Sequence, residues 1–252
     1  MIEIEHRDGV TLLAMARGKG NALNIELLEA LDAALARIEA ESSLPLVITG
    51  QGRSFCAGLD LPSITAGGAP YLQQLLPALT RALKRMVQFP RPVVAAVNGH
   101  AIAGGAIIMM SADHRIAALG EARIGLTELA VGVPFPAWPL EIARAAIPRE
   151  HFGRLIYTAA LVSPGEAHTL GLVDEVTEQE DLLERAFTVA RQLAAVPAAT
   201  FAISKRHVRA PLVEAAERRA ASDDHEVFTN WTSEATQQTI RAFVERTIGQ
   251  KK

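Results

Sequence analysis

The stretch Pro92–Asp113, PVVAAVNGHAIAGGAIIMMSAD, decides the fold, because a buried strand, a glycine-bearing turn and an apolar helix follow one another in it. Residues 93–97 are all apolar and rich in valine, which is typical of a strand buried on both faces. Asn98-Gly99 then predicts a turn, since both residues tolerate positive φ. Gly104-Gly105 opens a second apolar run, 106–112, that predicts a helix.

The start of that predicted helix offers a place for an anion. The first backbone N–H groups of a helix have no partner within the helix, and the helix dipole favours a negative oxygen there. Glycine lets such an oxygen approach the backbone closely. The same stretch also fits a tight crossover in which the glycines serve only packing, so the pattern alone leaves both interpretations open.

Composition limits the classes of function. The chain has 252 residues, 49% of them hydrophobic, which fits one domain with an extension. A net charge of −3, no dense basic stripe and only 5% aromatic residues argue against a nucleic acid partner. No apolar run reaches the roughly 20 residues of a membrane span, and the N-terminus lacks the apolar core of a signal peptide. We therefore expect a cytoplasmic protein without a membrane partner.

The segments before Pro92 predict short strands alternating with helices. Residues 1–16 alternate around Asp8-Gly9 and indicate a β-hairpin. Asn24 is placed to cap a helix whose leucines recur at helical spacing. Residues 46–49 predict a buried strand that leads into a glycine-bearing loop, 50–61, and a helix is expected from about Tyr71 to Gln88.

The segments after Asp113 continue this alternation up to residue 180. Residues 114–118 predict a strand, and the proline-punctuated segment 131–136 predicts a loop with little backbone freedom. Ser163-Pro164-Gly165-Glu166 has the form of a capping box at the start of a helix. Gly171 is expected to end that helix before a strand at 172–176.

From Asp181 to the end the pattern is wholly helical, with Pro197 and Pro211 expected as interruptions. Mixed strands and helices followed by helices alone indicate an α/β core with a helical tail. We place the boundary between residues 1–190 and residues 191–252.

Several segments resemble the enoyl-CoA hydratase/isomerase (crotonase) superfamily. SFCAGLDL at Ser54–Leu61 and NGHAIAGGAIIMMSADHRI at Asn98–Ile116 are similar to its two signature segments. NALN at 21–24, LVSPGEAHTLGLVDEV at 161–176 and AFVER at 242–246 match in the same order. The resemblance implies a spiral of ββα turns with an acyl-CoA site in residues 1–190. It also implies that the helical region 191–252 assembles trimers, often paired into hexamers.

The resemblance assigns a chemical role to the two glycine-bearing loops. The backbone N–H groups of Leu59 and Gly104 correspond to the family's oxyanion hole, which holds a thioester carbonyl oxygen as it becomes an enolate. Backbone donors suit this task because they are fixed before the reaction begins. Ala103 stands where many members carry a third glycine, and we expect the hole to tolerate its methyl group.

One glutamate is left for acid/base chemistry. Ile107 stands where hydratases of the family carry one of their two glutamates, and the addition of water is helped by two carboxylates. Glu128, in IGLTELAVGVPFP, resembles the single glutamate of the family's Δ3,Δ2-enoyl-CoA isomerases. One base is enough to move a proton from C2 to C4 of a 3-enoyl-CoA. Burial against Leu126, Val131 and Phe135 is expected to raise the pKa of Glu128 toward neutrality.

The resemblance also implies how coenzyme A is bound. Ala22 and Ala57 lie in the loops that line the family's coenzyme A site, and Arg246 matches a basic residue that meets the ribose phosphate. Lys251 or Lys252 are alternatives for that contact. The thioester substrate brings its own coenzyme A, so we expect no other cofactor, and no motif predicts a metal.

Two alternatives to an isomerase remain open at this level. A hydratase or another crotonase-type lyase would use Glu128 with a partner that the sequence does not locate. A non-catalytic acyl-CoA binding protein would explain why the family's active site is altered at Ile107. The length and structure of the acyl group depend on the shape of the pocket.

Overall fold

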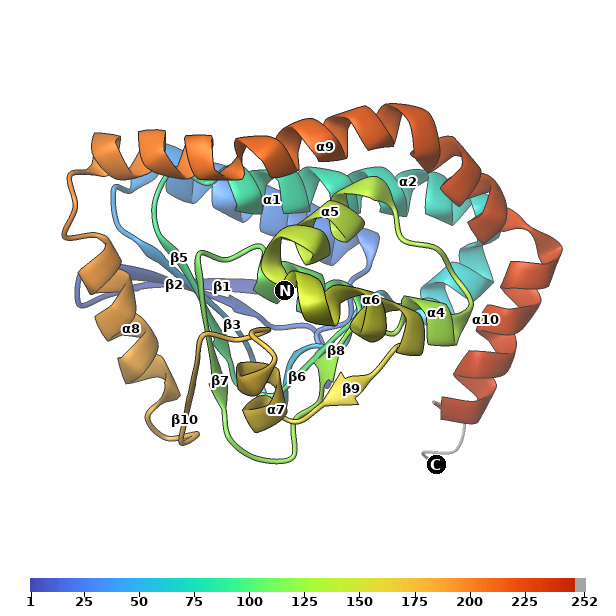
Figure 1. Ribbon diagram of the computed structural model, residues 1–252, viewed down its shortest axis with the longest axis horizontal. Helices are drawn as coiled ribbons and strands as arrows, with labels where there is room; N and C mark the ends of the chain where they lie inside the picture. Colours follow the sequence, from blue (N-terminus) through green and yellow to red (C-terminus); the bar gives the residue numbers. More distant parts are fainter. Residues whose placement is uncertain (248–252) are drawn as a thin grey trace.

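The computed structural model describes residues 1–247, and within them it contains two sheets and ten helices (Figure 1). The larger sheet consists of β1 (Ile2–Arg7), β2 (Val10–Met15), β3 (Leu46–Gly50), β5 (Val93–Val97), β7 (His114–Ala118) and β10 (Glu175–Thr177). The smaller sheet consists of β4 (Ser54–Cys56), β6 (His100–Ile102), β8 (Ile124–Gly125) and β9 (Leu161–Val162). The helices are α1 (Ile25–Glu41), α2 (Leu61–Gln88), α3 (Gly104–Met110), α4 (Glu128–Val131), α5 (Ala137–Ala146), α6 (Arg149–Thr158), α7 (Pro164–Thr169), α8 (Leu182–Leu193), α9 (Ala198–Thr232) and α10 (Glu234–Thr247).

The larger sheet has the order β1-β2-β3-β5-β7-β10, in which β1 and β2 are antiparallel and all later pairs are parallel. Its central strands are buried on both faces, as the run at 93–97 predicts. Val93 and Ala95 of β5 face the main hydrophobic core, whereas Val94 and Ala96 face a second core. Helix α8 covers that second face, and its Phe187 packs there with Val47 of β3 and Val94 of β5.

Each long strand from β3 onward is followed by a short strand and then by a helix. β3-β4-α2, β5-β6-α3 and β7-β8-α4 repeat this pattern, and β4, β6 and β8 pair in parallel. The predicted spiral of ββα turns is therefore confirmed. The repetition places the end of β4 beside the end of β6, and so it places the two glycine-bearing loops next to each other.

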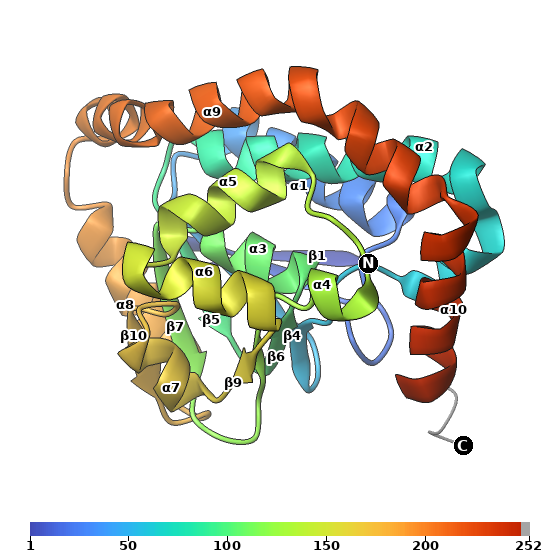
Figure 2. The same ribbon diagram turned by 45° about the vertical axis from the view of Figure 1, so that its right-hand side comes forward.

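The C-terminal helices wrap the outside of this core. Figures 1 and 2 both show α9 running along one side of the molecule, across α2 and α5, and α10 turning back from its far end. The predicted interruption at Pro197 is confirmed, since this residue precedes α9 directly, but the one at Pro211 is wrong because α9 continues through it. Within residues 1–247 no single helix is long and apolar enough to cross a membrane; α8 and α9 meet the test only as a pair bent by 98°. The division of the chain at residue 190 stays a prediction.

Local signals in the first fifty residues are confirmed. The β1–β2 hairpin turns at Asp8 and Gly9, which have φ of 51° and 76°. The side chain of Asn24 accepts a hydrogen bond from Leu27 N at 2.9 Å and caps α1 as predicted. These features depend on neighbouring residues only, so the sequence pattern is sufficient to find them.

Two predicted boundaries are wrong. Helix α2 begins at Leu61 rather than near Tyr71, because Asp60 caps it and the chain breaks the helical geometry only at Gly68. The strand expected at 172–176 begins at Glu175, since the N–H groups of the two residues after Gly171 bond to Ala167 O at the end of α7. The capping box that starts α7 is present as predicted.

The turn at Asn98-Gly99 also differs from its prediction, because neither residue has positive φ. Asn98 Oδ1 accepts a hydrogen bond from Gly50 N at 3.1 Å and so ties the turn to β3. A Cβ at residue 99 would lie 2.0 Å from Arg53 O, so glycine is required here for close approach. The residue with positive φ is Ala103, at 50°, directly before α3.

Candidate active site

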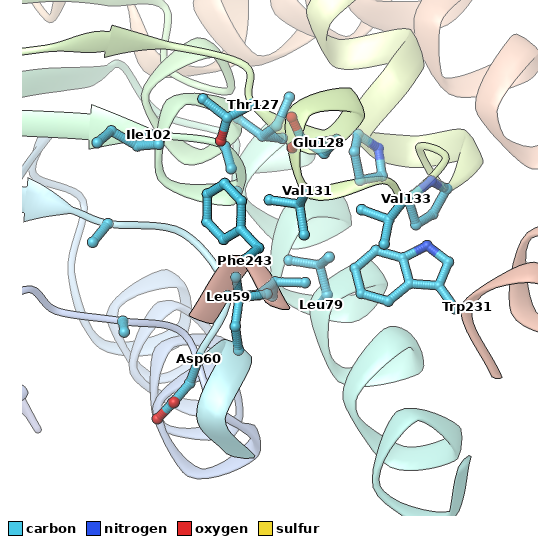
Figure 3. Close-up of a pocket in the computed structure, with 18 of the residues that line it drawn as sticks. Leu59, Asp60, Leu79, Ile102, Thr127, Glu128, Val131, Val133, Trp231 and Phe243 are labelled. Atoms are coloured by element: carbon cyan, nitrogen blue, oxygen red, sulfur yellow. The ribbon is translucent and has the colours of Figure 1, made fainter. Parts of the chain in front are cut away.

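A cavity of about 470 Å³ lies between the two glycine-bearing loops, α2, α4 and the C-terminal helices (Figure 3). Five of the six predicted site residues line it, namely Ala22, Ala57, Leu59, Gly104 and Glu128. The structure therefore brings together residues that are far apart in the sequence, as the resemblance implies.

The backbone N–H groups of Leu59 and Gly104 are available to a ligand. Leu59 lies in an isolated parallel bridge with Leu23, in which Leu23 N donates to Gly58 O at 2.8 Å and Asp60 N donates to Leu23 O at 2.9 Å. These bonds fix the backbone on both sides of Leu59 while its own N–H stays unbonded among the described residues. Gly104 opens α3, so its N–H has no partner within the helix.

The two loops touch each other at Gly58. A Cβ on this residue would lie 2.9 Å from Ile102 O and 3.0 Å from the Cβ of Ala103, and its φ is 88°. Only glycine permits this close approach with this backbone conformation. The methyl group of Ala103 therefore fits the fold, because it packs beside a residue that has no side chain.

The side chain of Asn21 holds the glycine-bearing loop 50–61 in place. This side chain is fully buried, and its Nδ2 donates at 2.9 Å to the backbone oxygen of Ser54, the first residue of β4. Its Oδ1 accepts a hydrogen bond from Arg17 N at 2.9 Å. Arg17 in turn donates to Ala22 O at 2.8 Å and forms an ion pair with Asp60 at 2.7 Å. These contacts connect the loop that carries Ala22 to the loop that carries Leu59 and Asp60.

Glu128 begins the short helix α4 and is 9% exposed. Its Oε2 atom is buried and has no hydrogen-bond partner among the described residues. Burial raises the pKa of Glu128 to about 7, and the nearby backbone N–H groups of Glu128 and Thr127 oppose this rise only in part. The direction agrees with the sequence-based prediction. A carboxyl with this pKa is a base near neutral pH.

Asp60 is the other carboxylate among the described residues that line the cavity. It is already engaged, because one oxygen pairs with Arg17 and the other accepts a hydrogen bond from Ser63 N at the start of α2. Glu128 is therefore the one acid side chain of the described cavity wall that has a buried oxygen without a hydrogen-bond partner.

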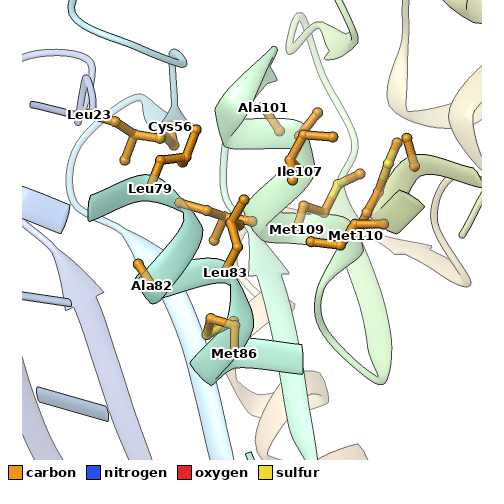
Figure 4. Close-up of a cluster of buried hydrophobic side chains, with 14 of the residues drawn as sticks. Leu23, Cys56, Leu79, Ala82, Leu83, Met86, Ala101, Ile107, Met109 and Met110 are labelled. Atoms are coloured by element: carbon orange, nitrogen blue, oxygen red, sulfur yellow. The ribbon is translucent and has the colours of Figure 1, made fainter. Parts of the chain in front are cut away.

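Beneath the cavity lies the main hydrophobic core (Figure 4). Ile107 is fully buried in α3, at the position that the sequence resemblance assigns to one of the two glutamates of the family's hydratases. Figure 4 shows it beside Ala101 and on the same helix as the buried Met109 and Met110. This part of the site therefore offers carbon atoms to a ligand and no acid or base.

Arg246 is not among the residues that line the cavity. Its guanidinium lies 5.5 Å from the ring centre of Phe243, and Phe243 itself contacts the cavity. The alternatives Lys251 and Lys252 lie outside the described residues. Among residues 1–247, no cluster of three or more His, Cys, Asp or Glu side chains is arranged to hold a metal ion.

Comparison with known proteins agrees with this geometry. A family model described as enoyl-CoA hydratase/isomerase matches residues 5–250. The chain belongs to this family. The protein is therefore an enoyl-CoA hydratase/isomerase family enzyme, and the recognised segments at Ser54–Leu61 and Asn98–Ile116 are the ones that build its cavity.

Relatives within the enoyl-CoA hydratase/isomerase family include proteins named as hydratases and proteins named as isomerases. The short-chain-enoyl-CoA hydratase of Clostridium acetobutylicum is 27% identical over 96% of this chain and 94% of its own. Human mitochondrial enoyl-CoA delta isomerase 1 is 25% identical over 98% of this chain and 82% of its own. The crystal structure of human mitochondrial delta3-delta2-enoyl-CoA isomerase has a TM-score of 0.92, with 25% identity over 100% of this chain and 99% of that chain. The choice between the two reactions therefore rests on the site.

Sequence reasoning missed part of this family member's site. Phe243 and Thr247 of α10 and Trp231 of α9 line the cavity, although they follow Glu128 by more than a hundred residues. A periodic helix pattern shows that these residues are helical but does not show what their helix covers. Asn21 was part of the recognised NALN segment, yet its fully buried side chain and its bonds to residues 51–55 appear only in the structure.

Proposed function

We propose that the protein converts 3-enoyl-CoA thioesters to 2-enoyl-CoA thioesters, with Glu128 as its single acid/base. The observation that carries this proposal is the buried Oε2 of Glu128, which has no protein partner in a cavity whose other described carboxylate is paired. An unpaired buried carboxyl with a pKa of about 7 suits repeated uptake and return of one proton.

The reaction needs two proton transfers and no water. Glu128 removes a proton from C2, and the electron pair of that C–H bond moves into the thioester carbonyl, which becomes a dienolate. The N–H groups of Leu59 and Gly104 hold the negative oxygen, where fixed backbone donors contribute most. Glu128 then returns the proton at C4, so the double bond moves from C3–C4 to C2–C3 and the carboxylate is regenerated.

The apolar side chain of Ile107 supports isomerisation over hydration. Hydration requires a water molecule to be activated and a proton to be delivered to carbon, and a second carboxylate helps to divide these tasks. The cavity offers carbon atoms at Ile107, so a water held there would lack a hydrogen-bond partner from this side chain.

The remaining parts of the proposal concern binding and assembly. We assign coenzyme A recognition to the main chain at Ala22 and Ala57, which line the cavity, and the phosphate contact to Arg246. No cofactor beyond the coenzyme A of the thioester enters this reaction scheme. We further propose a cytoplasmic homotrimer or hexamer assembled through the C-terminal helical region.

The experiment compares two substrates and two variants. We expect the protein to isomerise 3-hexenoyl-CoA and to leave crotonyl-CoA unhydrated. Glu128→Gln should lower kcat by about 10²- to 10⁴-fold, the usual contribution of general acid/base catalysis, while binding of the thioester persists. The matched control is Glu141→Gln, which changes another buried glutamate that lies outside the cavity and is paired with Arg219 at 3.0 Å. Wild-type turnover by Glu128→Gln would refute the mechanism.

A hydratase is the second candidate, because the Clostridium acetobutylicum relative bears that name. Hydration of crotonyl-CoA without isomerisation of 3-hexenoyl-CoA would select it. Binding of acyl-CoA thioesters with no turnover of either substrate would instead indicate an acyl-CoA binding protein.

A further inference from the structure

Trp231 is a buried residue of the cavity wall. It belongs to the last turn of α9, is 2% exposed and contributes to the cavity wall. Figure 3 shows its indole ring next to Val133 and on the opposite side of the cavity from Asp60, with Leu79 between them. Asp60 belongs to the glycine-bearing loop 50–61 and carries a carboxylate, so the cavity is charged at this end and aromatic at the end formed by Trp231.

Trp231 is held in place by two hydrogen bonds, one to its ring and one to its backbone. Its Nε1 donates a hydrogen bond to Pro134 O at 2.9 Å, in the segment that links α4 to α5. Its backbone oxygen accepts a hydrogen bond from Nε2 of Gln237 at 2.8 Å, and Gln237 is itself buried. The bond to Pro134 also uses the one polar atom of the ring, so only carbon atoms remain for contact with a ligand.

The wall between Glu128 and Trp231 is apolar. Leu79, Val131 and Val133 line this part, as Figure 3 shows. A hydroxyl or charged group at the far end of a ligand would lose its hydration here without gaining a partner. The far part of the cavity therefore suits a plain hydrocarbon chain.

We propose that Trp231 closes the acyl end of the cavity and sets the length of the hydrocarbon chain that the protein accepts. The inference rests on the proposed acyl-CoA site. With the thioester oxygen at Leu59 and Gly104, the acyl chain passes Glu128 and runs toward the indole ring. Chains that end before the ring are bound without strain, and longer chains meet a fixed wall.

A fluorescence titration tests this contact without requiring turnover. The chain has two tryptophans, and the other one, Trp138, is 1% exposed and is not part of the cavity wall. Trp138→Phe therefore leaves Trp231 as the only indole, and Trp231→Phe leaves Trp138. Saturated thioesters from butanoyl-CoA to dodecanoyl-CoA serve as unreactive probes, and free coenzyme A is the blank.

In Trp138→Phe, the emission of Trp231 should stay unchanged with short chains and shift once the chain is long enough to reach the ring. In Trp231→Phe, no probe should change the emission of Trp138. An equal response of Trp231 to every chain length, or no response to any bound probe, would overturn the proposal. Because these probes do not react, the result does not depend on which reaction the protein catalyses.

A second pair of variants tests selectivity. Trp231→Leu shortens the proposed wall, and Trp138→Leu is the matched loss of a buried indole elsewhere. We expect Trp231→Leu to raise the kcat/KM ratio of 3-dodecenoyl-CoA to 3-hexenoyl-CoA by about tenfold or more, the range over which small changes in an apolar pocket discriminate substrates. The same ratio should stay at its wild-type value in Trp138→Leu. An unchanged ratio in Trp231→Leu, or an equal change in both variants, would overturn the proposal.

Discussion

The substitution Glu128→Gln should change the free energy of unfolding, relative to wild type, in a pH-dependent way while it removes catalysis. The carboxyl of Glu128 is 9% exposed, and its Oε2 has no protein partner among the described residues. Ionisation in such a place is unfavourable, because the charged form loses its hydration and the backbone N–H groups of Glu128 and Thr127 compensate for this loss only in part. Glutamine has nearly the same shape and carries no charge, so the substitution removes this cost.

The magnitude follows from the pKa. Burial raises the pKa of Glu128 from 4.5 to about 7, and each pKa unit corresponds to about 1.4 kcal/mol. At low pH the carboxyl is protonated in both the folded and the unfolded chain. Between pH 4.5 and pH 7 the unfolded chain releases its proton first, so the free energy of unfolding falls as pH rises. Above pH 7 the loss is complete, at about 3 kcal/mol.

Thermal unfolding of wild type and Glu128→Gln at pH 5 and pH 8 measures this difference. The free energy of unfolding of the variant, relative to wild type, should be higher at pH 8 than at pH 5 by about 2 kcal/mol. This difference corresponds to a change in Tm of roughly 4–8 °C for a chain of this size. The buried amide of the variant has an unpaired N–H cost of about 1–3 kcal/mol, but this cost is the same at both pH values. A difference in Tm that does not change with pH would refute the reasoning.

Glu141→Gln is the control for this experiment. Glu141 is also buried, but its Oε1 pairs with Arg144 at 3.2 Å and with Arg219 at 3.0 Å. Its substitution leaves cations without their partner and should lower the Tm. If the Tm of Glu141→Gln relative to wild type also rose between pH 5 and pH 8, the effect would not be specific to residue 128.

Two further predictions concern catalysis. Because the base must be ionised, kcat/KM for 3-hexenoyl-CoA should rise with pH and level off above about 7, and a rate profile that is flat between pH 5 and pH 8 would contradict this. Gly58→Ala should lower kcat by about 10²- to 10³-fold, because a Cβ only 2.9 Å from Ile102 O displaces the Leu59 N–H. Gly52→Ala is its control in steady-state assays, since Gly52 has a similar φ of 78° but no atom within 4 Å of the added Cβ, and equal losses in both would attribute the effect to backbone strain alone.

The sequence predicts those parts of the fold that depend on neighbouring residues. The hairpin at Asp8-Gly9, the cap at Asn24 and the capping box at Ser163 each follow from side chains that act within a few positions of themselves. The buried strand at 93–97 follows from composition alone. Local patterns of this kind predict the structure correctly because the same local bonds form in most tertiary contexts.

The parts that the sequence does not predict depend on distant contacts. β4 and β6 have three residues each, too few for a period, and they exist because they pair with each other across the two glycine-bearing loops. Gly99 is required by the approach of another backbone segment, and Gly58 by such an approach together with its own positive φ of 88°. The position of Trp231 depends on its bond to Pro134, almost a hundred residues earlier in the chain.

The predicted site residues illustrate the same division. Five of them came from motifs and all five line one cavity, because the motifs carry the loops that the spiral brings together. Arg246 came from a weaker match in the C-terminal helix, and the structure places its side chain on Phe243 rather than in the cavity wall.

The residues that line the cavity range from Ala22 to Thr247, so they are spread over almost the whole length of the described chain. Synthesis proceeds from the N-terminus, and the early strands and helices have the chance to fold while the ribosome is still adding later ones. The cavity, however, lacks one wall until α10 has been made. An interrupted chain that ends before this helix would contain Glu128 and both glycine-bearing loops but would lack Phe243 and Thr247, so α10 is needed to complete the described cavity wall.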